Sequence, residues 1–151
     1  MADDARDASA LEPLIGVWDI EAASPRGDWS GTGRTTFEWL LGRAFVLERG
    51  EVDHPAAPDS HSILAPDPTR PGGWTQHYFD SRGVVRLYEM TFDGREWTLL
   101  RRTPDFSPLD FHQRYVGTLS DDGATIAGQW EASDDGKEWV TDFRLTYRRR
   151  R

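Results

Sequence analysis

Residues 111–148 read FHQRYVGTLSDDGATIAGQWEASDDGKEWVTDFRLTYR, and this stretch decides the fold. Apolar and polar residues alternate through three runs, which are separated by Asp122-Gly123 and Asp135-Gly136. Alternation with a period of two is typical of half-buried strands. An Asp-Gly pair between two such runs indicates a tight hairpin, because both turn residues adopt positive φ. The stretch therefore predicts three consecutive antiparallel strands.

The same pattern extends over most of the chain. Asp93-Gly94 repeats the hairpin signal, and Leu41-Gly42 and Arg82-Gly83 are weaker turns of the same kind. Ten strands are expected, at Ile15–Ala23, Gly31–Leu40, Ala44–Asp53, Ser60–Ala65, Trp74–Asp80, Val84–Phe92, Glu96–Thr103, Phe111–Leu119, Thr125–Ser133 and Glu138–Arg148. Because a long meander exposes two edges unless it closes, the sequence predicts an all-β, closed up-and-down antiparallel barrel of about ten strands.

The ends of the chain are expected to differ from the barrel. Residues 1–10 read as an acidic, disordered leader, except that Ser9–Leu14 is expected to form a short helical turn with Ser9 as its cap. Residues 11–148 are expected to form a single β-barrel domain. The arginines at 149–151 are expected to form a solvated basic tail.

Composition limits the classes of partner. The chain has 151 residues, 37% of them hydrophobic, which suits one domain with one core. A formal net charge of −8 argues against nucleic acid and membrane surfaces as partners. The absence of cysteine and of a signal-peptide pattern predicts a cytoplasmic protein.

The hairpin pairings assign an inner face. The turn at Asp122-Gly123 places Tyr115 opposite Trp130, and the turn at Asp135-Gly136 places Gly128 opposite Phe143. Both hairpins put Trp130 on the same apolar face, so we take that face as the interior. The pairings at Asp122-Gly123 and at the other turns also place five polar side chains on the inner face: Glu48, Arg86, Tyr88, Arg101 and Gln113.

These inward residues define a candidate ligand site. The residues expected to line or bind a ligand are Trp39, Glu48, Arg86, Tyr88, Arg101, Gln113, Tyr115, Trp130 and Phe143. An inward arginine needs an anion, since a buried unpaired charge is costly. Either Glu48 supplies that anion, or a carboxylate or phosphate of a ligand does, or the register is shifted by one residue and the arginines face water.

The sequence contains no strong catalytic or metal-binding motif. Candidates for acid–base or electrostatic roles are Glu48, Tyr88, His77 and Arg101. No histidine has the spacing of a zinc ligand, so no metal is expected, and no glycine-rich nucleotide loop precedes a helix.

Several segments resemble a mainly bacterial family of lipocalin-like, calycin-type proteins without an established activity. They are Leu14–Asp19, Gly33-x-x-x-Phe37-Glu38-Trp39-Leu40, Tyr78–Val84, Arg86-x-Tyr88-Glu89-Met90, Pro104–Phe106, Gln113-Arg114-Tyr115-x-Gly117, Trp130-Glu131-x-Ser133-x-Asp135-Gly136 and Trp139-x-x-Asp142-Phe143-x-Leu145-x-Tyr147. The resemblance spans residues 11–148. A more distant one is to nitrobindin-type haem barrels, which place a haem-binding histidine near the last strand, whereas residues 138–151 contain none.

Four functional hypotheses follow from these observations, the last of which is a structural or interaction module with a solid core and no pocket. The first is a barrel that binds a hydrophobic or amphipathic small molecule, with an anionic ligand as one option. The second is a natural-product cyclase or isomerase whose hydrophobic substrate occupies the barrel, an analogy at the level of the fold. The third is a haem protein, which the missing histidine disfavours, so no cofactor is expected. A homodimer is compatible with the barrel, although no residue pattern specifies one.

Overall fold

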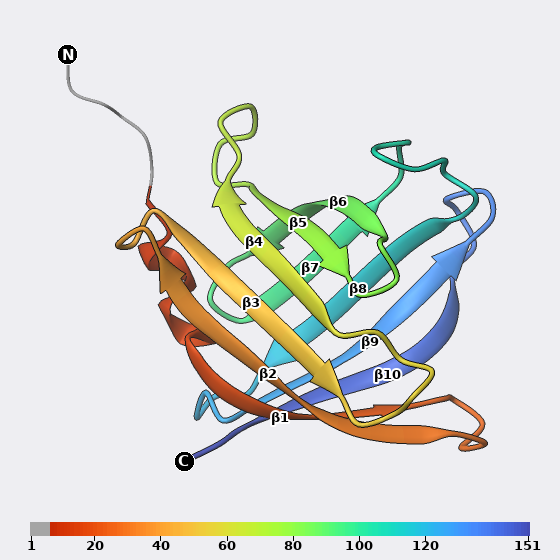
Figure 1. Cartoon of the computed structure of the whole chain (residues 1–151). Coiled ribbons are helices and arrows are strands. Elements are labelled where there is room, and N and C mark those ends of the chain that lie inside the picture. The colour runs from red at the N-terminus through yellow and green to blue at the C-terminus, as the bar shows by residue number, and fades with distance from the viewer. Residues whose placement is uncertain (1–6) are drawn as a thin grey trace.

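A computed structural model, which describes residues 7–151, shows a closed antiparallel barrel of ten strands (Figure 1). Each strand pairs with the next along the chain, and β1 pairs with β10 to close the barrel. The strands are β1 (Gly16–Ala23), β2 (Ser30–Leu40), β3 (Phe45–Val52), β4 (Ser60–Pro66), β5 (Trp74–Asp80), β6 (Val85–Phe92), β7 (Glu96–Arg101), β8 (His112–Leu119), β9 (Thr125–Ser133) and β10 (Val140–Arg149). The predicted fold class is confirmed.

The predicted register holds for the β8–β9 hairpin and is shifted by two residues in other hairpins. Tyr115 lies opposite Trp130 as expected. Trp130, however, also lies opposite Phe143 and not opposite Thr141. A shift of two residues keeps side chains on their predicted faces, so the assigned interior survives, except at the start of β10, where a shift of one residue places Thr141 opposite Glu131.

Aspartate side chains bind the backbone in two of the turns whose pairing is shifted. Asp93 Oδ1 accepts hydrogen bonds from the backbone N–H groups of Arg95 and Glu96, at 2.9 and 2.7 Å. Four residues, 93–96, therefore separate Phe92 from its partner Trp97. At Asp135 the same kind of cap is accompanied by an irregularity in β10 between residues 141 and 143.

One end of the barrel is closed by the short 3₁₀ helix η1 (Ser9–Leu14), at the left in Figure 1. Leu11 and Leu14 are fully buried, and the Trp18 indole N–H donates to the Leu14 carbonyl at 2.9 Å. Ser9 does not cap this helix as predicted; instead Asp7 Oδ1 accepts the Ser9 backbone N–H at 3.0 Å. No helix in residues 7–151 is long and apolar enough to cross a membrane.

The basic C-terminus is part of the barrel, which corrects the expected solvated tail. Arg149 belongs to β10, and its guanidinium donates to the carbonyls of Gly123 and Ile15 at 3.1 and 2.6 Å. It also stacks over the Trp18 ring, 4.2 Å from the centroid. Arg150 forms an ion pair with Asp19 on β1. These contacts fasten the last strand to the first at the closed end.

Aromatic side chains fill the middle of the barrel and form the floor of its open half. Tyr115 is fully buried, with its ring centroid 5.1 Å from that of Trp97 and 5.4 Å from that of Trp130. Its ring lies over Gly117 and Gly128, where an added Cβ would collide with the phenol. The two glycines thus make room for a large ring against the β8–β9 wall.

Candidate ligand-binding cavity

The barrel contains a cavity of about 670 Å³ above this aromatic floor. It opens at the end opposite η1, where the loops 24–29, 53–59, 81–84, 102–111 and 134–139 connect the strands (Figure 1). Residues of several of these loops line its mouth, among them Trp29, His54, Arg82 and Phe111. A volume of this size suits a small organic molecule.

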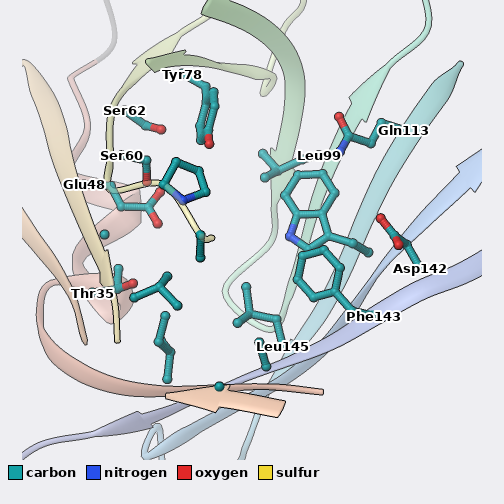
Figure 2. A pocket seen from close by; sticks show the side chains of 18 of the residues that line it. Thr35, Glu48, Ser60, Ser62, Tyr78, Leu99, Gln113, Asp142, Phe143 and Leu145 are labelled. Carbon is teal, nitrogen blue, oxygen red and sulfur yellow. The ribbon is translucent and has the colours of Figure 1, made fainter. Parts of the chain in front are cut away.

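One wall of the cavity is aromatic and aliphatic. Trp130, Phe143 and Leu145 project from β9 and β10, and Leu99 from β7. Figure 2 shows Leu99, Phe143 and Leu145 on the same side of the cavity. The Tyr88 ring extends this wall, with its centroid 5.5 Å from that of Trp130. Such a surface favours the apolar part of a ligand.

The opposite wall is polar and contains a buried carboxyl group. Glu48 on β3 is only 9% exposed, and its neighbours Thr35, Ser62 and Gln76 are also buried. Gln76 Nε2 donates to Glu48 Oε1 at 3.2 Å and to Ser62 Oγ at 3.3 Å. Burial raises the pKa of Glu48 to about 7. Figure 2 shows Thr35, Glu48 and Ser62 facing Leu99 and Phe143 across the cavity.

A second polar group lies on β6 and β8. Gln113 Oε1 accepts two hydrogen bonds, from Arg86 Nη1 at 3.0 Å and from the Tyr88 hydroxyl at 2.9 Å. All three side chains line the cavity. Arg86 Nε is buried and has no hydrogen-bond partner, and Arg86 forms no ion pair within residues 7–151. The guanidinium therefore keeps unused donors beside the cavity.

A third polar group lies at the mouth and is self-contained. The Tyr78 hydroxyl donates to Asp80 Oδ2 at 2.9 Å, and Arg82 Nη2 contacts the same oxygen at 2.7 Å. Burial opposes ionisation of Asp80, but the hydrogen bonds from Arg82 and Tyr78 outweigh it and lower the pKa of Asp80 to about 2. Because Asp80 neutralises Arg82, this cluster offers a ligand no unpaired charge.

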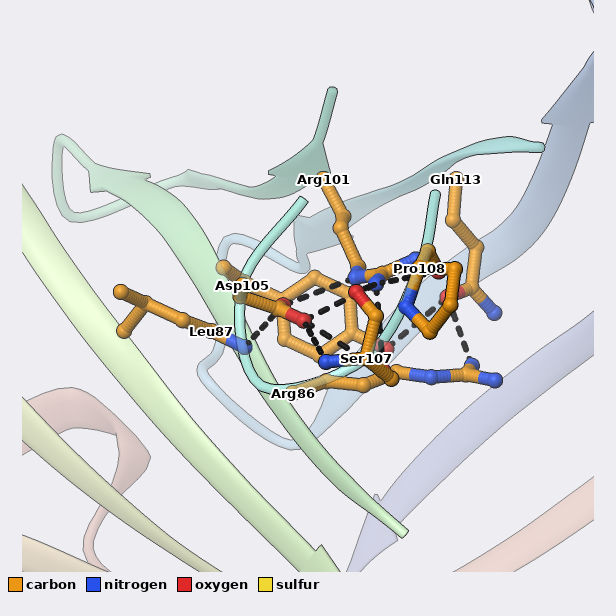
Figure 3. Close-up of polar contacts among 8 residues, drawn as sticks. Arg86, Leu87, Arg101, Asp105, Ser107, Pro108 and Gln113 are labelled. Atoms are coloured by element: carbon orange, nitrogen blue, oxygen red, sulfur yellow. Dashed lines mark hydrogen bonds and ion pairs between the residues drawn. The ribbon is translucent and has the colours of Figure 1, made fainter. Parts of the chain in front are cut away.

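Arg101 lies outside the cavity, under the β7–β8 loop (Figure 3). Its Nε and Nη2 atoms donate to Asp105 Oδ2 and Oδ1 at 2.8 and 2.9 Å, and the two side chains are 3% and 6% exposed. Asp105 Oδ2 also accepts the backbone N–H of Leu87 at 2.9 Å. The anion that this arginine requires is thus Asp105, and neither Glu48 nor a ligand supplies it.

Other predicted site residues lie away from the cavity. Trp39 lies toward the closed end, opposite Val46, and the Arg43 guanidinium stacks on its ring. Tyr115 lies in the floor without lining the cavity. His77 does not line the cavity either, and its Nε2 is hydrogen-bonded to the Thr75 hydroxyl at 3.1 Å. The predicted residues that the structure brings together around the cavity are Glu48, Arg86, Tyr88, Gln113, Trp130 and Phe143.

Part of the polar wall was not predicted from the sequence. Ser62, Gln76 and Tyr78 line the cavity but were not among the expected site residues. Gln76 lies between Trp74 and Tyr78 in a strand whose alternate residues face inward. That period of two was the available signal, but uncharged polar residues on an inner face stand out less than charged ones.

The described residues do not fit haem bound through a strand histidine. Haem iron commonly requires an axial side-chain ligand. His61, His77 and His112 do not line the cavity. His54 lies in a loop at the mouth, where its Nδ1 accepts the Ala56 backbone N–H at 3.0 Å. Within residues 7–151, no group of three histidine or carboxylate side chains is placed to hold a metal ion.

Comparison with known proteins shows the fold alone. No protein-family model matches the chain, and no curated protein sequence matches it, so the resemblance to lipocalin-like proteins stays a prediction. The structure is similar to that of Rv2717c from M. tuberculosis, with a TM-score of 0.68 and 17% sequence identity over 97% of this chain and 100% of that chain. It is more remotely similar to a de novo designed fluorescence-activating β-barrel, with a TM-score of 0.47 and 13% identity over 93% of this chain and 97% of that chain.

Proposed function

We propose that this barrel binds an amphipathic organic anion, whose acidic group contacts Arg86 and whose apolar part lies against the aromatic wall. The observation that carries the proposal is the Arg86 guanidinium, which borders the cavity without a carboxylate partner in the described chain. Arginine binds carboxylate and phosphate groups through two parallel N–H donors. A ligand anion would supply the missing partner.

The surroundings of Arg86 support an anion at this position. Gln113 holds Nη1 through its carbonyl oxygen, which leaves the other guanidinium donors available. Burial raises the pKa of the Tyr88 phenol, so its hydroxyl stays protonated and neutral. The nearby carboxylate of Asp105 is already neutralised by Arg101. Two other carboxylates line the cavity, Glu48 on the opposite wall and Asp142 on β10, and neither forms an ion pair with Arg86.

The contrast between the walls supports an amphipathic ligand. Trp130, Phe143 and Leu145 bury apolar surface, which favours a hydrocarbon or aromatic body by roughly 25 cal/mol per Å². A purely polar anion would leave this surface wet, and a pure hydrocarbon would leave Arg86 unpaired. A molecule with both parts satisfies both walls.

A change at Arg86 tests the proposal. Arg86→Met is expected to weaken the binding of dodecanoate at least about tenfold, because a charge-assisted hydrogen bond contributes about 1.5–3 kcal/mol. Quenching of intrinsic tryptophan fluorescence measures the dissociation constant. Dodecanol, which has the same chain without the charge, should lose little affinity in the variant.

Arg144→Met is the matched control, because it removes the same charge from an exposed position on β10, next to Phe143. It should bind dodecanoate like the unchanged protein. The proposal is wrong if the unchanged protein shows no saturable binding, or if Arg86→Met and Arg144→Met bind dodecanoate equally well.

The buried carboxyl group of Glu48 favours a second candidate function, acid–base isomerisation of a hydrophobic substrate. A pKa of about 7 suits proton transfer at neutral pH, and both Glu48 and Tyr88 face the cavity. His77 and Arg101, the other catalytic candidates, do not line it. Substrate turnover that disappears in Glu48→Gln would support this function, and binding without turnover would argue for the first.

A further inference from the structure

Glu48 and Arg86 occupy one row across the barrel wall. Glu48 lies opposite Ser62, Ser62 opposite Tyr78, and Tyr78 opposite Arg86, on strands β3 to β6. Three strand spacings separate the two charged residues, which amounts to roughly 14 Å along the sheet. Both side chains line the same cavity, and no ion pair joins them within residues 7–151. A single extended ligand can therefore reach both.

The Glu48 end of this row has unused hydrogen-bond acceptors. Glu48 Oε1 accepts a hydrogen bond from Gln76, while Oε2 has no partner in the described chain. Gln76 Oε1 is also buried without a partner. The Gln76 amide oxygen can accept hydrogen bonds but cannot donate one. Glu48 Oε2 is likewise an acceptor alone when the carboxyl group is ionised. The group that complements this cluster is therefore a donor.

We infer that the Glu48 cluster, formed by Glu48, Gln76 and Ser62, binds a hydrogen-bond donor at the end of the ligand remote from its acidic group. This inference rests on the proposed function, in which Arg86 binds the acidic group. The ligand class is an amphipathic acid that carries a hydroxyl or a protonated amine at its far end. A carboxylate that is 9% exposed and lacks a cationic partner in the described chain gains most from a protonated amine.

Three acids of equal chain length test the inference: dodecanoate, ω-hydroxydodecanoate and ω-aminododecanoate. Their dissociation constants are measured by tryptophan fluorescence in mildly alkaline buffer, where Glu48 is ionised. The ligand ω-aminododecanoate is expected to bind about tenfold more tightly than dodecanoate, since a hydrogen bond to a charged group contributes about 1.5–3 kcal/mol before desolvation of the amine. The hydroxy acid is expected between the two.

Two variants locate the preference. In Glu48→Gln, ω-aminododecanoate and dodecanoate should have about equal dissociation constants. Glu51→Gln removes the same charge from an exposed position on the same strand and should preserve that ratio. The expected stability of Glu48→Gln at this pH, discussed below, makes loss of folding a poor explanation for its effect.

Each outcome separates the inference from the proposed function. If dodecanoate binds as tightly as ω-aminododecanoate, the inference fails and the proposed function stands. If the preference persists in Glu48→Gln, the donor binds elsewhere and the inference also fails. If none of the three acids binds, the proposed function itself fails.

Discussion

Replacing Asp105 with asparagine is expected to lower the free energy of unfolding by about 3 kcal/mol. The change leaves the Arg101 guanidinium buried without its anion, and breaking a buried ion pair typically costs about 3–5 kcal/mol. We expect the lower end, because a single loop covers the pair. Asp105 also binds the Leu87 backbone N–H beyond the end of β7, so the change weakens the attachment of the loop to β6 (Figure 3).

A neighbouring exposed ion pair gives the control. Arg102 and Glu89 form an ion pair with side chains that are 59% and 39% exposed. Glu89→Gln is expected to change the free energy of unfolding by less than about 1 kcal/mol. Urea denaturation of both variants measures the difference. Equal effects of Asp105→Asn and Glu89→Gln would contradict the structural role of the buried pair.

The effect of Asp105→Asn should depend on pH. The hydrogen bonds from Arg101 lower the pKa of Asp105 well below its usual range, although burial opposes this. A carboxyl whose pKa is lower in the folded state stabilises the protein above its unfolded pKa, near 3.9, and loses that contribution as the pH falls toward the folded pKa. The difference between Asp105→Asn and the unchanged protein should therefore shrink in strong acid.

Replacing Glu48 with glutamine is expected to have the opposite effect on stability. Burial raises the pKa of Glu48 from 4.5 to about 7, so the folded protein holds a proton that the unfolded chain has released between these values. Stability then falls as the pH rises from 4.5 to 7 and stays reduced above 7. At 1.36 kcal/mol per pKa unit, the cost reaches about 3 kcal/mol as an upper value.

Glu48→Gln removes this cost, so it should unfold at higher urea concentration than the unchanged protein above pH 7 and at a similar one near pH 4.5. Glu51→Gln, on the outer face of β3, should leave the pH profile unchanged. If Glu48→Gln shows the same pH profile as the unchanged protein, Glu48 is not buried as the structure shows.

The strands and the inner face were predictable from the period of two. Errors in the β2–β3, β6–β7 and β9–β10 hairpins displaced the pairing by two residues over most of each strand and left those faces intact, but the irregularity between Thr141 and Phe143 moves Thr141 off the predicted inner face, opposite Glu131. Turn length was not predictable, because an aspartate in the turn does not decide it: Asp93 binds the backbone in a shifted turn, Asp122 does so in an unshifted one, and the shifted β2–β3 turn contains no aspartate. Glu48 was correctly expected to face inward.

The division of the interior into core and cavity was not predictable from the sequence. The inward pattern treats Trp39 and Trp130 alike, yet η1 closes one end only, so Trp39 lies near the closed end and Trp130 lines the cavity. Arg101 has the correct period for an inward residue, but its partner Asp105 lies in a loop without periodicity. Such pairings depend on how the loop folds back over β6.

A crystal structure of the protein with bound dodecanoate tests the proposed function most directly. We expect the ligand carboxylate within hydrogen-bond distance of Arg86, near Gln113 and Tyr88, and the hydrocarbon chain against Trp130 and Phe143. A carboxylate placed at the mouth beside Arg82, or a ligand bound outside the barrel, would contradict the assignment of Arg86 as the anion-binding residue.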